Sequence, residues 1–116
     1  MDKPTLSNTY EIQDINGEPM RLTLSYRWLY KLRAEHRDQY DAYNEVMTKG
    51  LKDVFDNITI LYTAYLCNIL KDTGDTSEAV SFDEFLDLLP VDQTDVIRAV
   101  GMLVAPKKTM ASAALS

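Results

Sequence analysis

The 116-residue chain has few of the residues on which catalysis and metal binding depend. Cys67 is the only cysteine and His36 the only histidine, so no intrachain disulfide can form and the Cys and His spacings of a zinc site are absent. The four glycines stand singly, which excludes a glycine-rich phosphate loop. We expect Cys67 to act as a small apolar residue and His36 as a hydrogen-bonded core residue. We therefore expect no catalytic residue, no cofactor, no metal and no enzymatic activity.

Positive charge and long apolar runs are also scarce. Twelve Lys and Arg residues face eighteen Asp and Glu residues, and the net charge of −6 disfavours nonspecific binding to nucleic acid or to an anionic membrane. The most apolar stretch, residues 54–70, contains Asp56, Asn57 and Asn68, so it predicts a buried helix and not a membrane span. The polar start, residues 1–8, is expected to be flexible and lacks the apolar run of a signal peptide. We expect a cytoplasmic protein.

Residues 9–24, "TYEIQDINGEPMRLTL", predict a β-hairpin around "DING". A three-residue loop with Gly17 in the left-handed position pairs Tyr10 with Leu22 and keeps the apolar side chains on one face. A two-residue turn would instead put Tyr10 opposite Thr23 and split the apolar set between the two faces. Because a slip of one residue exposes a whole apolar face to water, the first register is favoured.

Helical periodicity predicts the rest of the chain. We expect helices over about 26–49, 51–71, 82–89 and 93–104, with a bend or restart of the first near Asp38. Pro106 should end the last helix, because proline lacks the N–H group that a helix needs. The second helix carries the widest apolar stripe, which includes Leu51 and Phe55, and should be central.

The expected fold class is therefore mainly α (α+β): an N-terminal β-hairpin followed by four or five helices in a small bundle. We assign residues 9–105 to a single domain. Residues 106–116 have too little apolar content to pack and are expected to form a disordered tail.

The stretch "KDTGDTSEAVSFDEFLDLL" has acidic residues spaced much as in a calcium-binding EF-hand loop. With Glu84 at loop position 12, however, Thr73 replaces the first carboxylate and Glu78 takes the position that requires glycine. The same letters fit a helix start better, because Ser81 and Glu84 form an S-x-x-E capping box. Gly74 then ends the preceding helix. The pattern favours a helix stop, a polar loop and a helix start over a calcium site.

Aromatic residues supply the candidate functional surface. Trp28 falls off the main apolar stripe of its helix, while Tyr26 and Tyr30 are four residues apart and form a second patch beside Arg33 and Arg37. These side chains could pack under the hairpin, or they could form a contact surface for a partner or a second copy, since Trp, Tyr and Arg anchor many interfaces. The candidate partner-binding residues are Tyr26, Trp28, Tyr30, Tyr62 and Tyr65.

The order of these elements resembles a known family. A hairpin ending "MRLTLSYRWLYKL" leads to a long apolar helix, then to "SFDEFLDLLPVDQTDVIRAV" and a loose tail. From roughly Tyr10 to Val104 this is similar to the tail assembly chaperones of long-tailed, siphovirus-like bacteriophages and prophages. Matching residues stand in the family's strand-to-first-helix signature and in its late helix: Leu22, Leu24, Tyr26, Leu29 and Leu32 in the former, and Phe82, Phe85, Leu86 and Leu89 in the latter.

The resemblance implies a protein that binds the long helical tape measure protein, keeps it soluble and helps recruit tail tube subunits. It also implies self-association, a place in the bacterial host cytoplasm and absence from the mature virion. Many members are made in two lengths by a programmed ribosomal frameshift, and the codons of Lys107 and Lys108 can supply a slippery sequence here. A plain solubilising tail is the alternative. Two other functions stay open: a structural tail protein, or an α-rich protein-interaction module.

Overall fold

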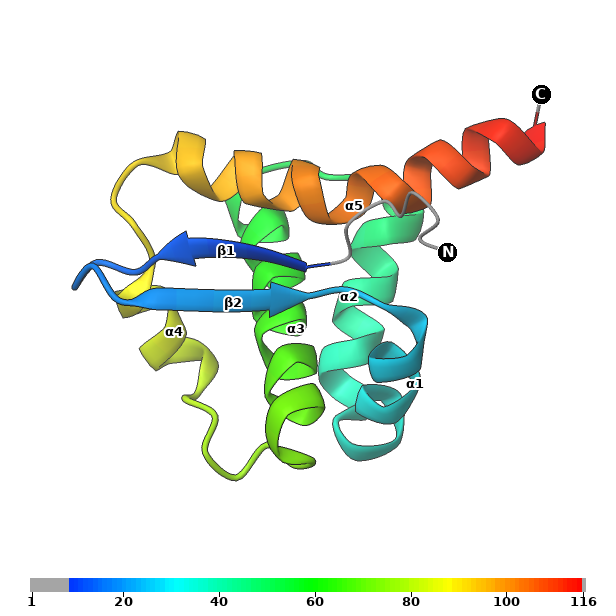
Figure 1. Cartoon of the computed structure of the whole chain (residues 1–116). Coiled ribbons are helices and arrows are strands. Elements are labelled where there is room, and N and C mark those ends of the chain that lie inside the picture. Colours follow the sequence, from blue (N-terminus) through cyan, green and yellow to red (C-terminus); the bar gives the residue numbers. More distant parts are fainter. Residues whose placement is uncertain (1–8, 116) are drawn as a thin grey trace, which may run out of the picture.

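The expected hairpin and helices are present in the computed structural model, which describes the backbone of residues 9–115 and the side chains of residues 9–104. In chain order the elements are β1 (Thr9–Gln13), β2 (Pro19–Thr23), α1 (Tyr26–Glu35), α2 (Arg37–Lys49), α3 (Val54–Thr73), α4 (Phe82–Leu88) and α5 (Gln93–Leu115), as Figure 1 shows. An antiparallel hairpin followed by five helices confirms the mainly α fold class. The flexible N-terminus predicted for residues 1–8 lies outside the described residues.

The hairpin has the predicted register, with Tyr10 opposite Leu22. The Asp14 N–H donates to the Glu18 carbonyl at 2.8 Å and the Gly17 N–H donates to the Asp14 carbonyl at 3.0 Å, which leaves a three-residue loop. Gly17 has a φ of 80°, the left-handed conformation that this loop requires. The apolar face of β2 consequently turns inward, and β2 packs on α3.

Helix α3 is the centre of the molecule, as expected. Figure 1 shows the hairpin in front of it, α1 and α2 on one side, α4 on the other side and α5 across one end. The face of α3 that carries Ile60, Ala64 and Cys67 is also fully buried, since all three residues are 0% exposed. A helix that is apolar all round is stable only with neighbours on every side.

The start of α3 differs from the prediction. The Asp53 side chain caps the helix by accepting a hydrogen bond from the Asp56 N–H, so the helix begins at Val54 and not at residue 51. Leu51 stays in the loop at 42% exposure, and Phe55 lies in the first turn at 61% exposure. Neither residue belongs to the core, because this end of α3 precedes the first buried turn.

The predicted first helix, residues 26–49, restarts as expected, although the break lies at His36 and not at Asp38. It divides at His36, whose φ of −137° and ψ of 68° leave the helical region. The His36 N–H still donates to the Leu32 carbonyl and its carbonyl accepts from the Tyr40 N–H, so residue 36 closes α1 and opens α2. The half-buried imidazole shares a hydrogen bond with Thr76 Oγ1. The break lets α1 and α2 pack on each other as well as on α3, which a straight helix excludes.

The two C-terminal helices follow the prediction at one end and depart from it at the other. Ser81 and Glu84 form the predicted capping box at the start of α4. Helix α5, however, continues past Pro106 to Leu115, where we expected an end at Val104 and a disordered tail. A proline removes one helical hydrogen bond and bends a helix without forbidding its continuation. Figure 1 shows the axis of α5 changing direction between its orange and red parts.

Candidate functional site

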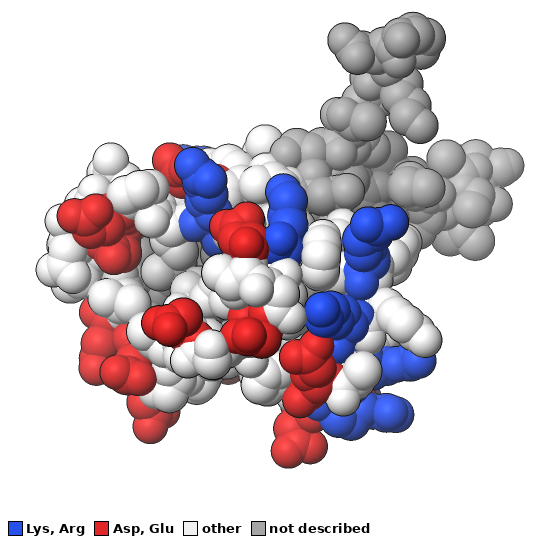
Figure 2. Space-filling view, turned by 60° about the horizontal axis from the view of Figure 1, so that its bottom comes forward, with Lys and Arg blue, Asp and Glu red and all other residues white. Residues whose placement is uncertain are grey.

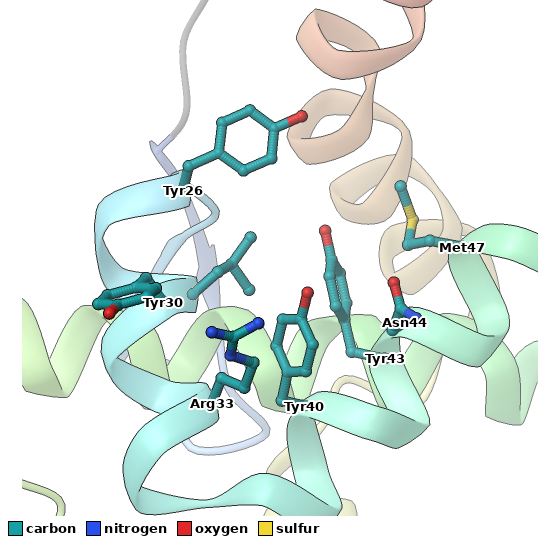
Figure 3. A pocket seen from close by; sticks show the side chains of 8 residues that line it. Tyr26, Tyr30, Arg33, Tyr40, Tyr43, Asn44 and Met47 are labelled. Carbon is teal, nitrogen blue, oxygen red and sulfur yellow. The ribbon is translucent and has the colours of Figure 1, made fainter.

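A groove of about 370 Å³ lies between α1 and α2. We call it the tyrosine groove; its walls are Tyr26, Leu29, Tyr30 and Arg33 from α1 and Tyr40, Tyr43, Asn44 and Met47 from α2. In Figure 3, the side chains of Tyr40, Tyr43 and Met47 rise from α2 toward the opening, and Tyr26 faces them from the start of α1. The groove therefore combines an apolar floor with phenol groups at its opening.

Helical spacing on both walls builds this groove. Residues three and four apart share a helix face, and the lining positions follow that spacing on α1 and again on α2. The break at His36 turns the second set to face the first. Tyr26 and Tyr30 keep 72% and 70% of their surface exposed, because the groove opens to solvent on the α1 side. Two large, solvent-exposed aromatic side chains thus flank an apolar hollow.

The groove has a positive wall. The Arg33 guanidinium carbon lies 5.4 Å from the centre of the Tyr30 ring, a distance suited to a cation–π contact. Of the five arginines in the described residues, Arg21, Arg37 and Arg98 form ion pairs with carboxylates, whereas Arg27 and Arg33 form none. Both of these arginines belong to α1. Their positive charge is therefore available to an incoming carboxylate.

Tyr43 supplies a hydrogen-bond donor in the α2 wall of the groove. Burial, above all, raises the pKa of its hydroxyl beyond the ordinary value of 10, and the neighbouring Cys67, Tyr26 and Tyr40 add to the effect. The phenol consequently stays neutral and keeps its proton at physiological pH. The ring contacts Tyr40 at a centroid distance of 6.2 Å. Neutral phenols beside an arginine suit a ligand that carries both apolar atoms and an oxygen acceptor.

Tyr62 and Tyr65, two of the predicted partner-binding residues, lie elsewhere. The Tyr62 hydroxyl donates to the Val80 carbonyl at 2.8 Å, and the Tyr65 hydroxyl accepts from the Val80 N–H at 2.9 Å. Their rings stack 5.8 Å apart and contact Phe82 and Phe85 of α4. Both tyrosines hold the loop before α4 against α3. Their hydroxyl groups are already used within the chain.

Trp28 does not line the groove either. It is half-buried and packs against the hydrophobic core. The structure brings together Tyr26, Tyr30 and Arg33, as the sequence suggested, but Arg37 turns away and pairs with Asp41 at 3.2 Å. Of the five candidate partner-binding residues, two therefore lie in the tyrosine groove.

The α2 wall was missed from the sequence. Tyr40, Tyr43 and Met47 recur at three- and four-residue steps within the expected helix 26–49, and that spacing is equally typical of a core stripe. The break at His36 is the feature that makes them face α1. The sequence predicts a restart near Asp38, but not the direction in which the second part of the helix folds back.

The acidic stretch before α4 is organised by its own hydrogen bonds. Asp75 Oδ1 accepts from the N–H and the hydroxyl of Ser77 at 2.9 and 2.7 Å, and these bonds lower the pKa of the Asp75 carboxyl. Across the described residues, no cluster of three or more His, Cys, Asp or Glu side chains is placed to hold a metal ion. No helix in that part of the chain has the length and hydrophobicity of a membrane span.

Comparison with protein-family models, with curated proteins and with solved structures gives no match to this chain. Lys107 and Lys108, the residues at the expected frameshift position, have side chains outside the described residues. Function is therefore inferred from the residues and from the geometry of the tyrosine groove.

Proposed function

We propose that this protein is a non-enzymatic tail assembly chaperone that holds apolar helical segments of a tape measure protein in the tyrosine groove. The observation that carries the proposal is the groove itself: two tyrosines that are 72% and 70% exposed flank an apolar hollow of about 370 Å³. The resemblance of the element order to tail assembly chaperones supplies the identity of the partner. In this role the protein acts in the bacterial host cytoplasm and is absent from the mature virion.

The chemistry of the groove suits a helical client. An amphipathic helix presents apolar side chains at three- and four-residue spacing, and a hydrophobic groove between two helices receives such side chains well. Leu29 and Met47 offer apolar contacts, and the tyrosines add large contact areas at low cost in conformational entropy. The net charge of −6 keeps the loaded complexes apart in solution. Release needs no chemical step, since the contacts are noncovalent.

Two further parts of the role follow from the same resemblance. The protein helps recruit tail tube subunits to the tape measure protein, and it is the short form of a pair whose longer member arises by frameshifting at the codons of Lys107 and Lys108. Sequencing the native DNA tests the second part. A slippery heptamer, an overlapping frame and a very long helical reading frame downstream are expected. Absence of all three would leave a structural tail protein or a general interaction module as the better assignment.

Coexpression with the tape measure protein tests the client site. The wild-type chain should keep the client in the soluble fraction and copurify with it. Replacing Tyr26 and Tyr30 by Ala should weaken that capture at least about tenfold, because exposed tyrosines at interface centres contribute more than about 1.4 kcal/mol.

Phe55 provides the matched control for this experiment. It is an aromatic residue on α3 with 61% exposure, and it does not line the groove. Phe55→Ala should capture the client as the wild type does. Equal losses from the groove variant and from Phe55→Ala would refute the assignment of the groove. Recovery of the protein from purified virions would favour a structural tail component.

A further inference from the structure

The outer edge of strand β1 borders another hollow, of about 240 Å³. We call it the edge slot; its lining residues are Tyr10, Glu11, Ile12 and Gln13 of β1, Pro90 of the link between α4 and α5, and Asp95 and Arg98 of α5. Successive side chains of a strand point to opposite faces of a sheet, so a hollow lined by four consecutive residues lies along the strand's edge. Figure 1 shows α5 running beside that edge of β1. The edge slot shares no lining residue with the tyrosine groove.

The hairpin register decides which backbone groups of β1 face the edge slot. The Asp14 N–H donates to the Glu18 carbonyl at 2.8 Å, so these two residues form a hydrogen-bonded pair. Hydrogen-bonded and non-hydrogen-bonded pairs alternate along an antiparallel ladder, which places Glu11 and Gln13 in pairs of the second kind. The N–H and carbonyl groups of Glu11 and Gln13 therefore point away from β2 and toward the slot.

The two edges of the hairpin differ in what they offer to another strand. The sheet has two strands in the described part of the chain, so each strand has one edge without a strand partner. On β2, Pro19 stands opposite Gln13, and its nitrogen lies on the outer edge without a hydrogen to donate. Strand β1 contains no proline, and its Glu11 and Gln13 are exposed. Unpaired backbone groups on an exposed edge are a template for a further strand.

The end of the edge slot near Pro90 is held in place before any ligand arrives. The Ile15 N–H donates to the Leu88 carbonyl at 2.8 Å, which ties the loop of the hairpin to the end of α4. The ring of the nearby Pro90 restricts its own backbone. A preformed site loses little conformational entropy on binding, so the slot is suited to capture a segment that is itself flexible.

The charge around the edge slot favours a basic ligand. Residues 71–92, which include Pro90, contain seven carboxylates and one lysine, and this excess equals the whole net charge of −6. Figure 2 shows acidic side chains gathered on the left, on the side of α4. Inside the slot, Arg98 already pairs with Asp95 at 3.4 Å. A lysine or arginine placed beside Glu11 would form a cross-strand pair with its carboxylate.

We propose that the edge slot binds an extended peptide segment of a partner protein, which adds to β1 as an antiparallel strand. The segment bonds the outward backbone groups of Glu11 and Gln13, as in other cases of strand addition to a sheet edge. Residues that pair across two strands share a face, so the segment carries a basic side chain beside Glu11 and an apolar one beside Ile12. The proposal does not depend on the proposed function, because neither the tyrosine groove nor its client takes part.

A fluorescein-labelled peptide of alternating lysine and valine is the probe. It should bind the purified chain in fluorescence anisotropy and slow hydrogen exchange at the N–H groups of Glu11 and Gln13. A lysine opposite Glu11 directs its own N–H toward β1, whereas the valines direct theirs away. N-methylation of the lysines should therefore weaken binding at least about tenfold, and N-methylation of the valines should not. A peptide with glutamate in place of lysine should also bind at least about tenfold more weakly.

Two proline variants of the protein form a matched pair. Glu11 and Arg21 stand opposite each other, and either substitution breaks their ion pair of 3.5 Å. Each substitution also removes one N–H that points away from the other strand, a position where proline is tolerated. Only Glu11→Pro alters the edge slot, so it should weaken peptide binding at least about tenfold, while Arg21→Pro should bind as the wild type does. Circular dichroism checks that both variants fold.

Several outcomes would overturn the proposal. They are no binding of the lysine–valine peptide by the wild type, equal binding of the two methylated peptides, and equal affinities of the two proline variants. Equal binding of the glutamate peptide would refute the basic ligand. The methylated peptides are tested on the wild type, so their result stands even if a proline variant does not fold. Loss of client capture in the groove variants changes none of these results.

Discussion

At the residue scale, Thr23 joins the hairpin to the central helix through a buried polar contact. Its hydroxyl donates to Asn68 Oδ1 at 2.8 Å, and Asn68 Nδ2 donates to Asp72 Oδ2 at 3.0 Å. Thr23 and Asn68 are 3% and 7% exposed. Water cannot easily replace a missing partner at this depth, so the pair fixes the position of β2 on α3.

We expect Thr23→Val to lower the free energy of unfolding by about 1–3 kcal/mol, because it leaves Asn68 Oδ1 buried without this donor. Urea denaturation at neutral pH measures the change. Thr48→Val is the control: Thr48 is exposed, and its hydroxyl bonds only to carbonyls of its own helix, so the effect should stay within about 0.5 kcal/mol. Equal changes in the free energy of unfolding for both variants would show that the bond to Asn68 does not stabilise hairpin docking.

The raised pKa of the buried Tyr43 hydroxyl should make the free energy of unfolding depend on pH. Its pKa in the folded protein is raised, mainly by burial, above the value near 10 that the unfolded chain has. Above pH 10 the unfolded state loses the proton first, the folded state binds more protons, and stability falls as pH rises. The slope is up to about 1.4 kcal/mol per pH unit for one such group.

Comparing wild type with Tyr43→Phe isolates this contribution. In chemical denaturation between about pH 9 and 11, the free energy of unfolding of Tyr43→Phe should decline less steeply with pH than that of the wild type. The difference in slope should correspond to about one proton. Burial also raises the pKa of Tyr62, but that residue is present in both proteins and cancels in the difference. Parallel pH profiles would show that Tyr43 ionises equally in the folded and unfolded chains.

At the element scale, local chemistry explains which predictions succeeded. The hairpin register follows from one glycine and two alternating faces, and the start of α4 follows from Ser81 and Glu84, so neighbours in sequence decide both. How α2 folds back on α1 after His36 depends on the packing of both helices on α3. Helix α5 continues past Pro106 because a proline bends a helix without forbidding its continuation. Periodicity alone predicts the same stripe for one helix as for two that fold back. The tyrosine groove was missed for that reason.

The attachment of α4 is an element-scale prediction. Tyr62 and Tyr65 hold both backbone groups of Val80, so the loop before α4 is fixed to α3 by two phenols. Tyr65→Phe removes the acceptor of the Val80 N–H and should cost about 1 kcal/mol of stability, with faster hydrogen exchange at the start of α4. Tyr30→Phe, at an exposed site, should change neither quantity. Unchanged exchange in Tyr65→Phe would contradict this role.

At the scale of the whole molecule, the sequence shows that charge is separated along the chain, but it does not show where the charged segments lie in space. Counting residues places the acidic excess in residues 71–92 and a basic run in residues 21–33. Only the fold puts these segments on opposite sides and sets Arg33 beside an apolar hollow. The charge pattern alone predicts solubility, whereas pattern and fold together give the groove a positive wall.

Salt should test whether the positive wall of the groove matters to client capture. Between about 0.1 and 1 M ionic strength the screening length falls from about 10 Å to about 3 Å, which weakens attraction between Arg33 and any carboxylate on the client. Capture of an apolar client helix depends on buried area and should change little over the same range in a copurification experiment. Capture that declines steeply with sodium chloride would mean that charge, and not the apolar hollow, holds the client.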